Sequence, residues 1–347
     1  DHRDLHSFPT RRSSDLIQKD LDDGIDTIGK KMTVCQLYAK QIRHRGNVRY
    51  NTKNGRKRLM KLLEEDKLGG CPIDSVKLSD AKEWAIRMKE KGISYKTISN
   101  DKRSLKAAFY TAIQDDCIRK NPFDFQLNTV IEDDTEPKVP LTPAQEESFL
   151  SFAQNDKVYQ KYYDELIILL GTGLRISELC GLTDTDINFE NRIINVDHQL
   201  LRSAETGYYI ETPKTKSGIR QIPMSEKVYE AFNRVLKRRR GAKAVTIDGY
   251  SNFLFLNRDG YPKTATNYDG MFRGLAKKYN KYHEEALPKV MTPHTLRHTF
   301  CTNMANAGMN PKALQYIMGH SNITMTLNYY AHATFDSAKA EMLRIAA

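Results

Sequence analysis

Two arginines and a histidine have the residue types and spacing of a phosphate-binding site. Arg175 stands at the expected start of a helix, directly after a Gly-Thr-Gly-Leu segment. His294 and Arg297 lie three residues apart after a Thr-Pro pair, so they share a face on the first turn of a helix opened by proline. A helix N-terminus favours an anion. Two arginines and a histidine that converge there would form a planar, bidentate phosphate clamp.

Metal and nucleotide chemistry fit the sequence less well. His294 and His298 have the spacing of two metal ligands on one helix face, but no acidic residue stands between them and no cysteine pairs with them. Residues 24–30 have the spacing of a P-loop, but Lys31 stands where a serine or threonine must hold magnesium. The Gly-Thr-Gly segment lacks the third glycine of a dinucleotide-binding loop. We therefore expect no metal ion and no cofactor, neither ATP nor NAD.

The composition indicates a folded, basic protein. The 347 residues include 54 lysines and arginines against 43 aspartates and glutamates, a formal net charge of +11, which favours a polyanionic partner such as nucleic acid. The longest aliphatic run, Leu166–Leu170, is far shorter than the roughly 20 apolar residues of a membrane span, so no membrane partner is expected. The five cysteines are odd in number and form no C-x-x-C pair, which argues against a disulfide framework and fits a reducing cytoplasm.

A helical pattern extends from residue 32 to about residue 125. Its clearest helix begins after Ser94 and repeats apolar residues at helical spacing, and the helix before it is expected to begin at a Ser79-Asp80 cap. Eight lysines and arginines and no acidic residue lie between Arg43 and Lys61. Alone, this run fits a solvated helix face as well as a surface that neutralises a phosphate backbone.

An α+β region follows a linker. Residues 126–141 are acidic, contain proline and show no periodicity, and Thr142-Pro143 then begins a helix with a capping-box pattern. Between residues 192 and 224 the apolar period changes to two, which predicts short strands. The strands are expected at Ile193–Val196, Tyr208–Glu211 and Ile219–Ile222, and helices at 162–170, 225–240, 265–280, 293–307, 311–318 and 322–330.

The late part of the chain completes a pattern with Gly319-His320 and, ten residues later, Tyr330. The order of Arg175, a lysine in the turn around residue 214, His294-x-x-Arg297, the Gly-His pair and the tyrosine resembles the tyrosine recombinase (phage integrase) family. Within this family, the phrases TGLRISEL, VDHQL, TPHTLRHTF, MNPKALQYIMGH and TLNYYAH are most similar to integrases of conjugative transposons of the Tn916 type.

The resemblance implies a role for each residue of the pattern. Arg175 and Arg297 would grip the scissile phosphate and stabilise the charge of the transition state. Tyr330 would be the nucleophile, giving a 3'-phosphotyrosyl bond and a free 5'-hydroxyl. His294 would handle the tyrosine proton, and His320 would donate a hydrogen bond to the phosphate.

The family also places a general acid on a hairpin lysine. Lys214 fits the family pattern of a lysine followed by threonine just before the turn, and Lys216 is the alternative. Glu178 would support the site without reacting. Tyr329 is a competitor for the nucleophile, but the T-x-x-x-Y-x-H spacing selects Tyr330.

The implied fold is multidomain. An all-α, SAM-like core-binding domain that binds DNA would precede an α+β tyrosine recombinase catalytic domain with a small three-stranded antiparallel sheet. Residues 1–16 look like a translated sequencing adapter, so we expect a non-native segment there and a missing native N-terminal portion. The expected organisation is a linker remnant at 17–31, the core-binding domain at 32–125, a linker at 126–141, the catalytic domain at 142–335 and a C-terminal tail at 336–347.

The implied activity is site-specific recombination of double-stranded DNA, for integration and excision of a mobile element. By resemblance, a homotetramer would act on two duplexes through a Holliday junction, and protomers would exchange the segment after Tyr330. An excisionase or a host DNA-bending protein is a further expected partner. Two alternatives stay open: a type IB topoisomerase uses similar residues without synapsis, and a catalytically inactive relative would bind DNA as a regulator.

Overall fold

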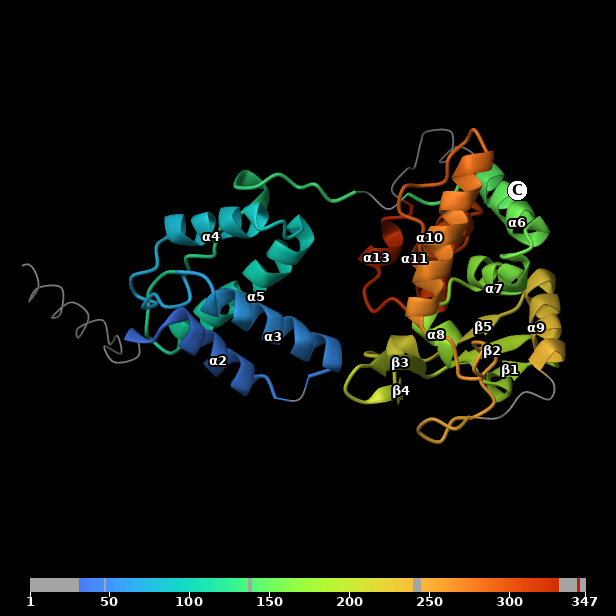
Figure 1. Cartoon of the computed structure of the whole chain (residues 1–347), viewed down its shortest axis with the longest axis horizontal. Helices are drawn as coiled ribbons and strands as arrows, with labels where there is room; N and C mark the ends of the chain where they lie inside the picture. The colour runs from blue at the N-terminus through green and yellow to red at the C-terminus, as the bar shows by residue number, and fades with distance from the viewer. Residues whose placement is uncertain (1–30, 47, 137–138, 240–244, 331–341, 344–347) are drawn as a thin grey trace, which may run out of the picture. The chain divides into compact units, whose positions relative to one another are not determined.

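The chain divides into two compact units between residues 136 and 137 (Figure 1). The computed structural model describes residues 31–46, 48–136, 139–239, 245–330 and 342–343. The adapter-like segment at 1–16, the P-loop-like segment at 24–30 and most of the tail at 336–347 lie outside these residues. The two units are called here the N-terminal and the C-terminal unit.

The described part of the N-terminal unit is helical. Thr33 begins the first helix through a capping box with Gln36, and Ser94 is the N-cap of the longest helix, as predicted. The predicted Ser79-Asp80 cap is wrong, because Asp80 is already the third helical residue and its carboxylate accepts the Lys77 N–H at 2.8 Å. The helices are α2 (Val34–His44), α3 (Tyr50–Glu64), α4 (Leu78–Glu90) and α5 (Tyr95–Gln114), followed by the 3-10 turn η2 (Leu127–Thr129).

An aromatic cluster lies at the core of this unit. Trp84 of α4, Phe109 of α5 and Phe123 are fully buried. The Trp84 and Phe109 ring centroids lie 5.7 and 5.4 Å from that of Phe123, in edge-on and tilted arrangements that aromatic rings favour. These contacts join α4, α5 and the segment after α5 into one helical body.

Basic residues of the run at 43–61 differ in their surroundings. Arg58 reaches the buried carboxylate of Asp101 at 2.5 Å and so supports the fold. Lys53 and Lys61 are exposed. They help to line a surface groove of about 560 Å³ formed by residues of α2, α3 and the connection between them.

The C-terminal unit begins with α6 (Pro143–Asn155), whose Thr142 cap and N-terminal proline confirm the predicted helix start. The next helix, predicted at 162–170, continues through Gly171 and ends at Gly173, whose φ of +63° terminates it. The last helix is shorter than the predicted 322–330, because the residues after Leu327 form i, i+3 turns instead. The helices are α7 (Tyr163–Thr172), α8 (Ile176–Gly181), α9 (Glu226–Arg239), α10 (Ala265–Tyr282), α11 (Pro293–Asn306), α12 (Pro311–Met318) and α13 (Thr324–Leu327), with 3-10 turns η3 (Gln160–Tyr162), η4 (Asp184–Asp186) and η5 (Lys216–Gly218).

Two small antiparallel sheets complete this unit. A three-stranded sheet has the order β1 (Ile187–Asn188), β2 (Ile193–Val196), β5 (Arg220–Pro223), with Ile194 opposite Ile222. The predicted strand at 208–211 is β4 (Gly207–Glu211), but it pairs with β3 (Gln199–Ser203) in a separate two-stranded sheet. The sequence did not indicate β3, because Gln-Leu-Leu-Arg-Ser alternates poorly.

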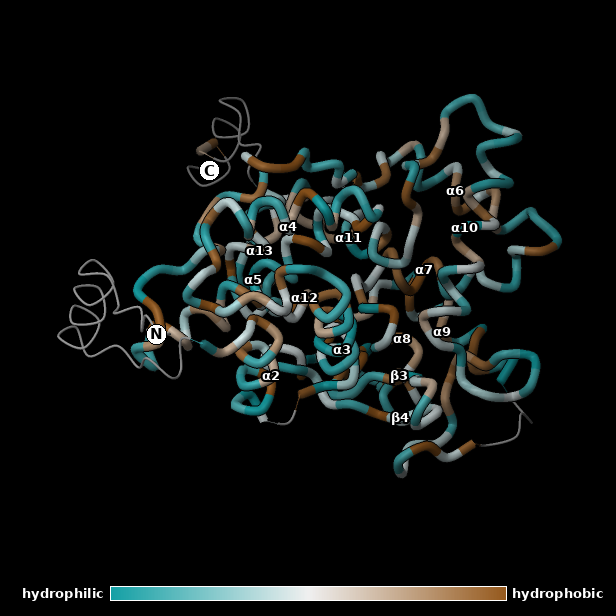
Figure 2. The backbone as a smooth tube through the Cα atoms, turned by 60° about the vertical axis from the view of Figure 1, so that its left-hand side comes forward, coloured by the Kyte–Doolittle hydropathy of each residue, from teal (hydrophilic) through white to brown (hydrophobic). Residues whose placement is uncertain are grey.

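Helix α7 lies at the centre of the C-terminal unit, between α9 and α11. Its Leu166, Ile168 and Leu169 side chains are fully buried. This packing brings the end of α7, and the α8 N-terminus that follows it, beside α11. In Figure 2, hydrophilic (teal) and hydrophobic (brown) stretches follow one another along the tube. Among the described helices, none is long and apolar enough to cross a membrane.

Candidate functional site

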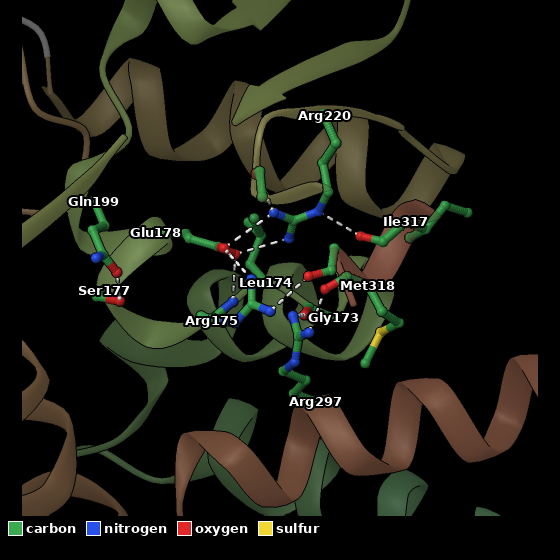
Figure 3. Close-up of polar contacts among 12 residues, drawn as sticks. Gly173, Leu174, Arg175, Ser177, Glu178, Gln199, Arg220, Arg297, Ile317 and Met318 are labelled. Atoms are coloured by element: carbon green, nitrogen blue, oxygen red, sulfur yellow. Dashed lines mark hydrogen bonds and ion pairs between the residues drawn. The ribbon is translucent and has the colours of Figure 1, made fainter. Parts of the chain in front are cut away.

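Three arginines from distant parts of the chain converge on the C-terminal end of α12 (Figure 3). Each donates a hydrogen bond to a different one of three consecutive backbone carbonyls. The bonds run from Arg220 Nε to Ile317 O at 2.6 Å, from Arg297 Nη2 to Met318 O, and from Arg175 Nη2 to Gly319 O at 3.0 Å. We call these three side chains the arginine cluster.

The end of a helix explains this convergence. The last carbonyls of an α-helix have no partner within the helix and carry its partial negative charge, so cations are stabilised there. Gly319 ends α12 in the left-handed conformation, at a φ of +62°. A side chain on Gly319 would meet Ser217 O at 3.0 Å and Arg220 Nη1 at 3.1 Å, so glycine is needed for this close approach.

Glu178 is the carboxylate that holds two members of the arginine cluster. It accepts hydrogen bonds from Arg220 Nη1 at 3.0 Å, Arg220 Nη2 at 2.8 Å and Arg175 Nη1 at 2.6 Å. Burial alone would raise the pKa of Glu178, but the bonds and charge of Arg220, with the charges of Arg175 and Arg297, lower it to about 2. Glu178 therefore supports the site, as the sequence predicts.

The arginine cluster carries more positive than negative charge, and this affects Arg297. Its side chain is buried and its Nη1 donates to Gly173 O at 2.5 Å. Burial and the charge of Arg175 lower the pKa of Arg297 to about 9. It remains charged at neutral pH, in surroundings that favour the arrival of an anion. Arg175, whose side chain is 37% exposed, is the arginine that such an anion can reach from solvent.

His320 lies directly beside the arginine cluster. It is buried, and its Nδ1 lies 3.0 Å from the Thr326 hydroxyl. Burial, followed by the charges of Arg297, Arg175, Arg220 and His294, lowers the pKa of His320 to about 4. The imidazole is therefore neutral at pH 7 and carries a single N–H that it can donate.

The two candidate lysines lie on a loop that touches the arginine cluster. The loop, residues 212–218, lies between β4 and β5, and we call it the lysine loop. Its Gly218 carbonyl accepts a hydrogen bond from Arg220 Nη1 at 3.0 Å. Both Lys214 and Lys216 are exposed. The structure thus brings the loop to the site without distinguishing the two lysines.

The remaining two predicted residues lie at the edge of the site. His294 is exposed on the first turn of α11. The Tyr330 hydroxyl donates to Met309 O at 2.5 Å, so it is engaged by the turn between α11 and α12 and not by the arginine cluster. Burial and Cys301 raise the pKa of Tyr330. The neighbouring Tyr329 packs edge-on against His298, with ring centroids 4.8 Å apart.

Arg220 is the residue of the cluster that the sequence prediction missed. Its side chain is fully buried at the first position of β5, where Arg220 and Ile222 both point inward. A charged residue at an inward position of an alternating strand needs a buried partner. The position of Arg220 two residues before Ile222, on the same face of the strand, was the signal in the sequence that could have identified it.

Gly173 offers a test of how tightly the site is packed. A Cβ on Gly173 would lie 2.4 Å from Phe300 Cδ1, whereas one on Gly207, at a similarly positive φ of +71°, has nothing in the described chain within 4 Å. We expect Gly207→Ala to lower the free energy of unfolding by about 1 kcal/mol and Gly173→Ala by about 3 kcal/mol, since only the latter adds overpacking to the backbone strain. Urea denaturation measures both, and equal losses would contradict the packing of Gly173 against Phe300.

Comparisons with known proteins agree on one family. The model of the phage integrase family matches residues 140–337. The chain is 69% identical over 329 residues to the transposase of transposon Tn916 from Enterococcus faecalis and, equally, to that of transposon Tn1545 from Streptococcus pneumoniae, covering 95% of this chain and 81% of each relative.

A solved structure gives the same result for the fold. The Tn1549 transposon integrase in complex with transposon right end DNA is 78% identical, has a TM-score of 0.86, and is matched over 91% of this chain and 100% of that chain. This likeness confirms the predicted fold class. The chain belongs to the phage integrase family, the tyrosine recombinases.

Proposed function

We propose that this tyrosine recombinase is the site-specific recombinase of a mobile element and that it cuts and rejoins duplex DNA through a covalent bond to Tyr330. The observation that carries the proposal is the arginine cluster, in which three guanidinium groups meet at the end of α12 and two of them, those of Arg175 and Arg220, share the carboxylate of Glu178. Such preorganised positive charge favours a phosphate and stabilises the charge that develops on it. The Tn916 and Tn1545 relatives are transposases, and the Tn1549 integrase binds transposon right end DNA and a circular intermediate DNA, which supports an element end as substrate.

The proposed reaction begins with the scissile phosphate bound at Arg175 and Arg297. Arg175 would contact the phosphate from the solvent-exposed side, and the buried Arg297 would add its positive charge from inside the protein. His320, neutral at pH 7, donates its N–H to a phosphate oxygen. Because these donors are already fixed by α12, little reorganisation is needed as charge builds up on the phosphate.

Strand cleavage is a transesterification. The Tyr330 oxygen attacks phosphorus while the bond from phosphorus to the 5' oxygen breaks. The tyrosine proton passes to His294, and Lys214 gives a proton to the leaving 5' oxygen. The products are a 3'-phosphotyrosine and a 5'-hydroxyl. Attack by the 5'-hydroxyl of a partner strand reverses each of these changes, so the phosphodiester bond is conserved and rejoining consumes no ATP.

Tyr330 must change its hydrogen-bond partner before it can attack. Its hydroxyl is donated to the Met309 carbonyl, so the hydroxyl has to leave that carbonyl when DNA enters. Breaking one hydrogen bond of this kind costs only about 1 kcal/mol. Binding of a phosphate at the arginine cluster can offset that cost, since charge-assisted hydrogen bonds are stronger than neutral ones.

The number of strands that must be cut supports a tetramer. Recombination of two duplexes cuts four strands, and each cut strand needs its own Tyr330. We therefore propose that four protomers act together on double-stranded DNA, with an excisionase or a host DNA-bending protein as an accessory factor. Because the substrate would be the DNA of the cell that carries the element, the cytoplasm is the proposed location.

The groove on α2 and α3 is the proposed backbone-binding surface of the N-terminal unit. Each phosphate neutralised there should contribute about 0.9 to the slope of log Kd against log salt concentration. Replacing Lys53 and Lys61 together by alanine should therefore lower that slope by about 1.8. Fluorescence anisotropy with a labelled duplex between roughly 50 and 200 mM salt measures it.

The charge-preserving replacement of the same two lysines by arginine is the control, and it should keep the original slope. An unchanged slope in the alanine variant would place the DNA elsewhere on the chain.

Capture of a covalent adduct tests the proposed function. A duplex that carries the element's end and a nick close to the cleavage site loses a short fragment after cleavage, so rejoining fails and the protein stays attached. We expect such an adduct with element-end DNA. Relaxation of a supercoiled plasmid that lacks the element's end would instead support a topoisomerase, and the absence of both reactions would support a DNA-binding regulator.

A further inference from the structure

Arg220 contacts three elements of the site, namely α8, α12 and the lysine loop, and it is too buried to reach a ligand itself. Its side chain is 0% exposed. Nε donates to Ile317 O at 2.6 Å, Nη1 donates to Gly218 O and to Glu178 Oε1, both at 3.0 Å, and Nη2 donates to Glu178 Oε2 at 2.8 Å. Four of the five N–H groups of the guanidinium are thus engaged within the chain. Arg220 is therefore not a phosphate ligand in the way proposed for Arg175.

The contact with Gly218 controls the turn that carries Lys214. The Gly218 N–H donates to Thr215 O at 2.9 Å. A Cβ on Gly218 would lie 2.3 Å from Pro213 Cβ, so this glycine packs directly on the residue before Lys214. Holding Gly218 in place therefore holds the residues on both sides of Lys214, although the lysine side chain itself is exposed.

The contact with Glu178 links that turn to the phosphate-binding arginines. One carboxylate oxygen, Glu178 Oε1, accepts from both Arg220 Nη1 and Arg175 Nη1. The contact with Ile317 joins the same guanidinium to the end of α12, where Arg297 and Arg175 are also bound. A planar guanidinium can satisfy three such partners in one fixed geometry, which a lysine cannot.

We propose that Arg220 is a positioning residue for strand cleavage: it fixes the lysine loop relative to Arg175 and Arg297, so that the loop's lysine can protonate the leaving 5' oxygen. The inference rests on the proposed function, in which a lysine of this loop is the general acid. A buried ion pair is weak support for stability, since apolar side chains of similar volume often serve the fold as well. Arg220 joins the loop, α8 and α12 as an apolar side chain could not.

A change of leaving group separates positioning from mere support of the fold. Replacing the bridging 5' oxygen of the scissile phosphate by sulfur gives a thiolate leaving group, which is a much weaker base and departs without a proton. Loss of the proton donor, or its misplacement, therefore slows cleavage of ordinary DNA but not of the sulfur-containing DNA. A general loss of active enzyme slows both equally.

The test is single-turnover cleavage by the full chain carrying Arg220→Lys, on both DNAs. We expect cleavage of ordinary DNA to slow on the order of 10- to 100-fold, as for a catalytic group displaced by about 1 Å, with little change on the sulfur-containing DNA. Lys214→Ala and Lys216→Ala, measured in parallel, show which lysine gives the same pattern. In the double variant with that lysine replaced, Arg220→Lys should slow cleavage of ordinary DNA by less than about a further twofold, because both changes impair the same proton transfer.

Two further variants keep the result interpretable. Arg234→Lys alters an arginine that also pairs with a buried carboxylate, Asp164 at 2.8 Å, but on α9, away from the site. It should cleave both DNAs at the wild-type rate. If Arg220→Lys does not fold, Gly218→Ala moves the lysine loop against Pro213 without changing any charge, and it should give the same selective rescue by sulfur.

Equal slowing of Arg220→Lys on the two DNAs would overturn the proposal. So would a double variant in which the fold-losses in cleavage rate of Arg220→Lys and of the lysine variant multiply in full. For Gly218→Ala, equal slowing would have the same meaning. Failure of the proposed function looks different, because the wild-type chain would then form no covalent adduct with either DNA.

Discussion

Tyr330→Phe should abolish covalent attachment to DNA while leaving DNA affinity within about twofold of the wild-type value. The phenyl ring keeps its packing beside the helices α11 and α12, and only the hydroxyl that attacks phosphorus is lost. Removing the nucleophile of a covalent mechanism lowers the rate of the chemical step by at least about 10⁴-fold. The variant loses the bond to Met309 O, worth about 1 kcal/mol, so it should remain folded. Denaturing gel electrophoresis of the adduct with nicked duplex measures the effect.

Tyr329→Phe is the matched control for this prediction. It removes the neighbouring hydroxyl and keeps the ring that packs against His298. Adduct formation should persist at near the wild-type rate. An adduct formed by Tyr330→Phe, or one lost in Tyr329→Phe, would show that the assignment of the nucleophile is wrong.

Glu178→Gln should lower the free energy of unfolding by about 3–5 kcal/mol, the cost of breaking a buried ion pair from one side. The substitution keeps the size of the side chain but leaves Arg175 and Arg220 without their shared negative charge, and its amide group faces two donors. Glu226→Gln is the control, because that carboxylate pairs with Arg192 at 2.6 Å on the surface. It should cost less than about 1 kcal/mol. Similar losses in both variants would contradict the role of Glu178.

The low pKa of Glu178 gives the same prediction a pH dependence. The pKa falls from 4.5 to about 2 in the folded chain, so the stabilisation is complete above about pH 4.5 and is lost as the pH falls toward 2. The shift corresponds to about 3 kcal/mol. The pKa of His320 is lowered from 6.5 to about 4. This group therefore costs stability in a different window, as the pH falls from about 6.5 to about 4, because only the unfolded chain takes up the proton there. Glu178→Gln should therefore remove the loss below about pH 4.5 and leave the loss above it.

Helix starts were the part of the fold most easily predicted, because their signals are local. Thr142 begins α6 through a capping box with Gln145, three positions further on, and Ser94 is the N-cap residue of α5. Strand pairing was harder to predict. The strand β4 was recognised from its alternation, but its partner β3 was not, because pairing depends on contacts that a single strand's pattern does not contain.

The site was predicted in part for the same reason. Motifs identified Arg175, Arg297 and His320, which the structure brings together. The carbonyls at the end of α12 hold the arginine cluster, and the sequence could not predict this. Arg220 and Arg175 are 97 and 144 residues away from the carbonyls that they bind. The Tyr330–Met309 hydrogen bond likewise has no signal in the sequence, since any carbonyl can accept it. The domain boundaries and the catalytic roles stay predictions.

The most direct measurement of the central claim is to identify the residue that carries the DNA. The adduct trapped on a nicked duplex is digested with nuclease and protease, and mass spectrometry locates the residual nucleotide on the peptides. The proposed mechanism predicts a nucleotide joined through its 3' phosphate to Tyr330. A nucleotide on Tyr329 or on any other residue, or one joined through a 5' phosphate, would contradict it.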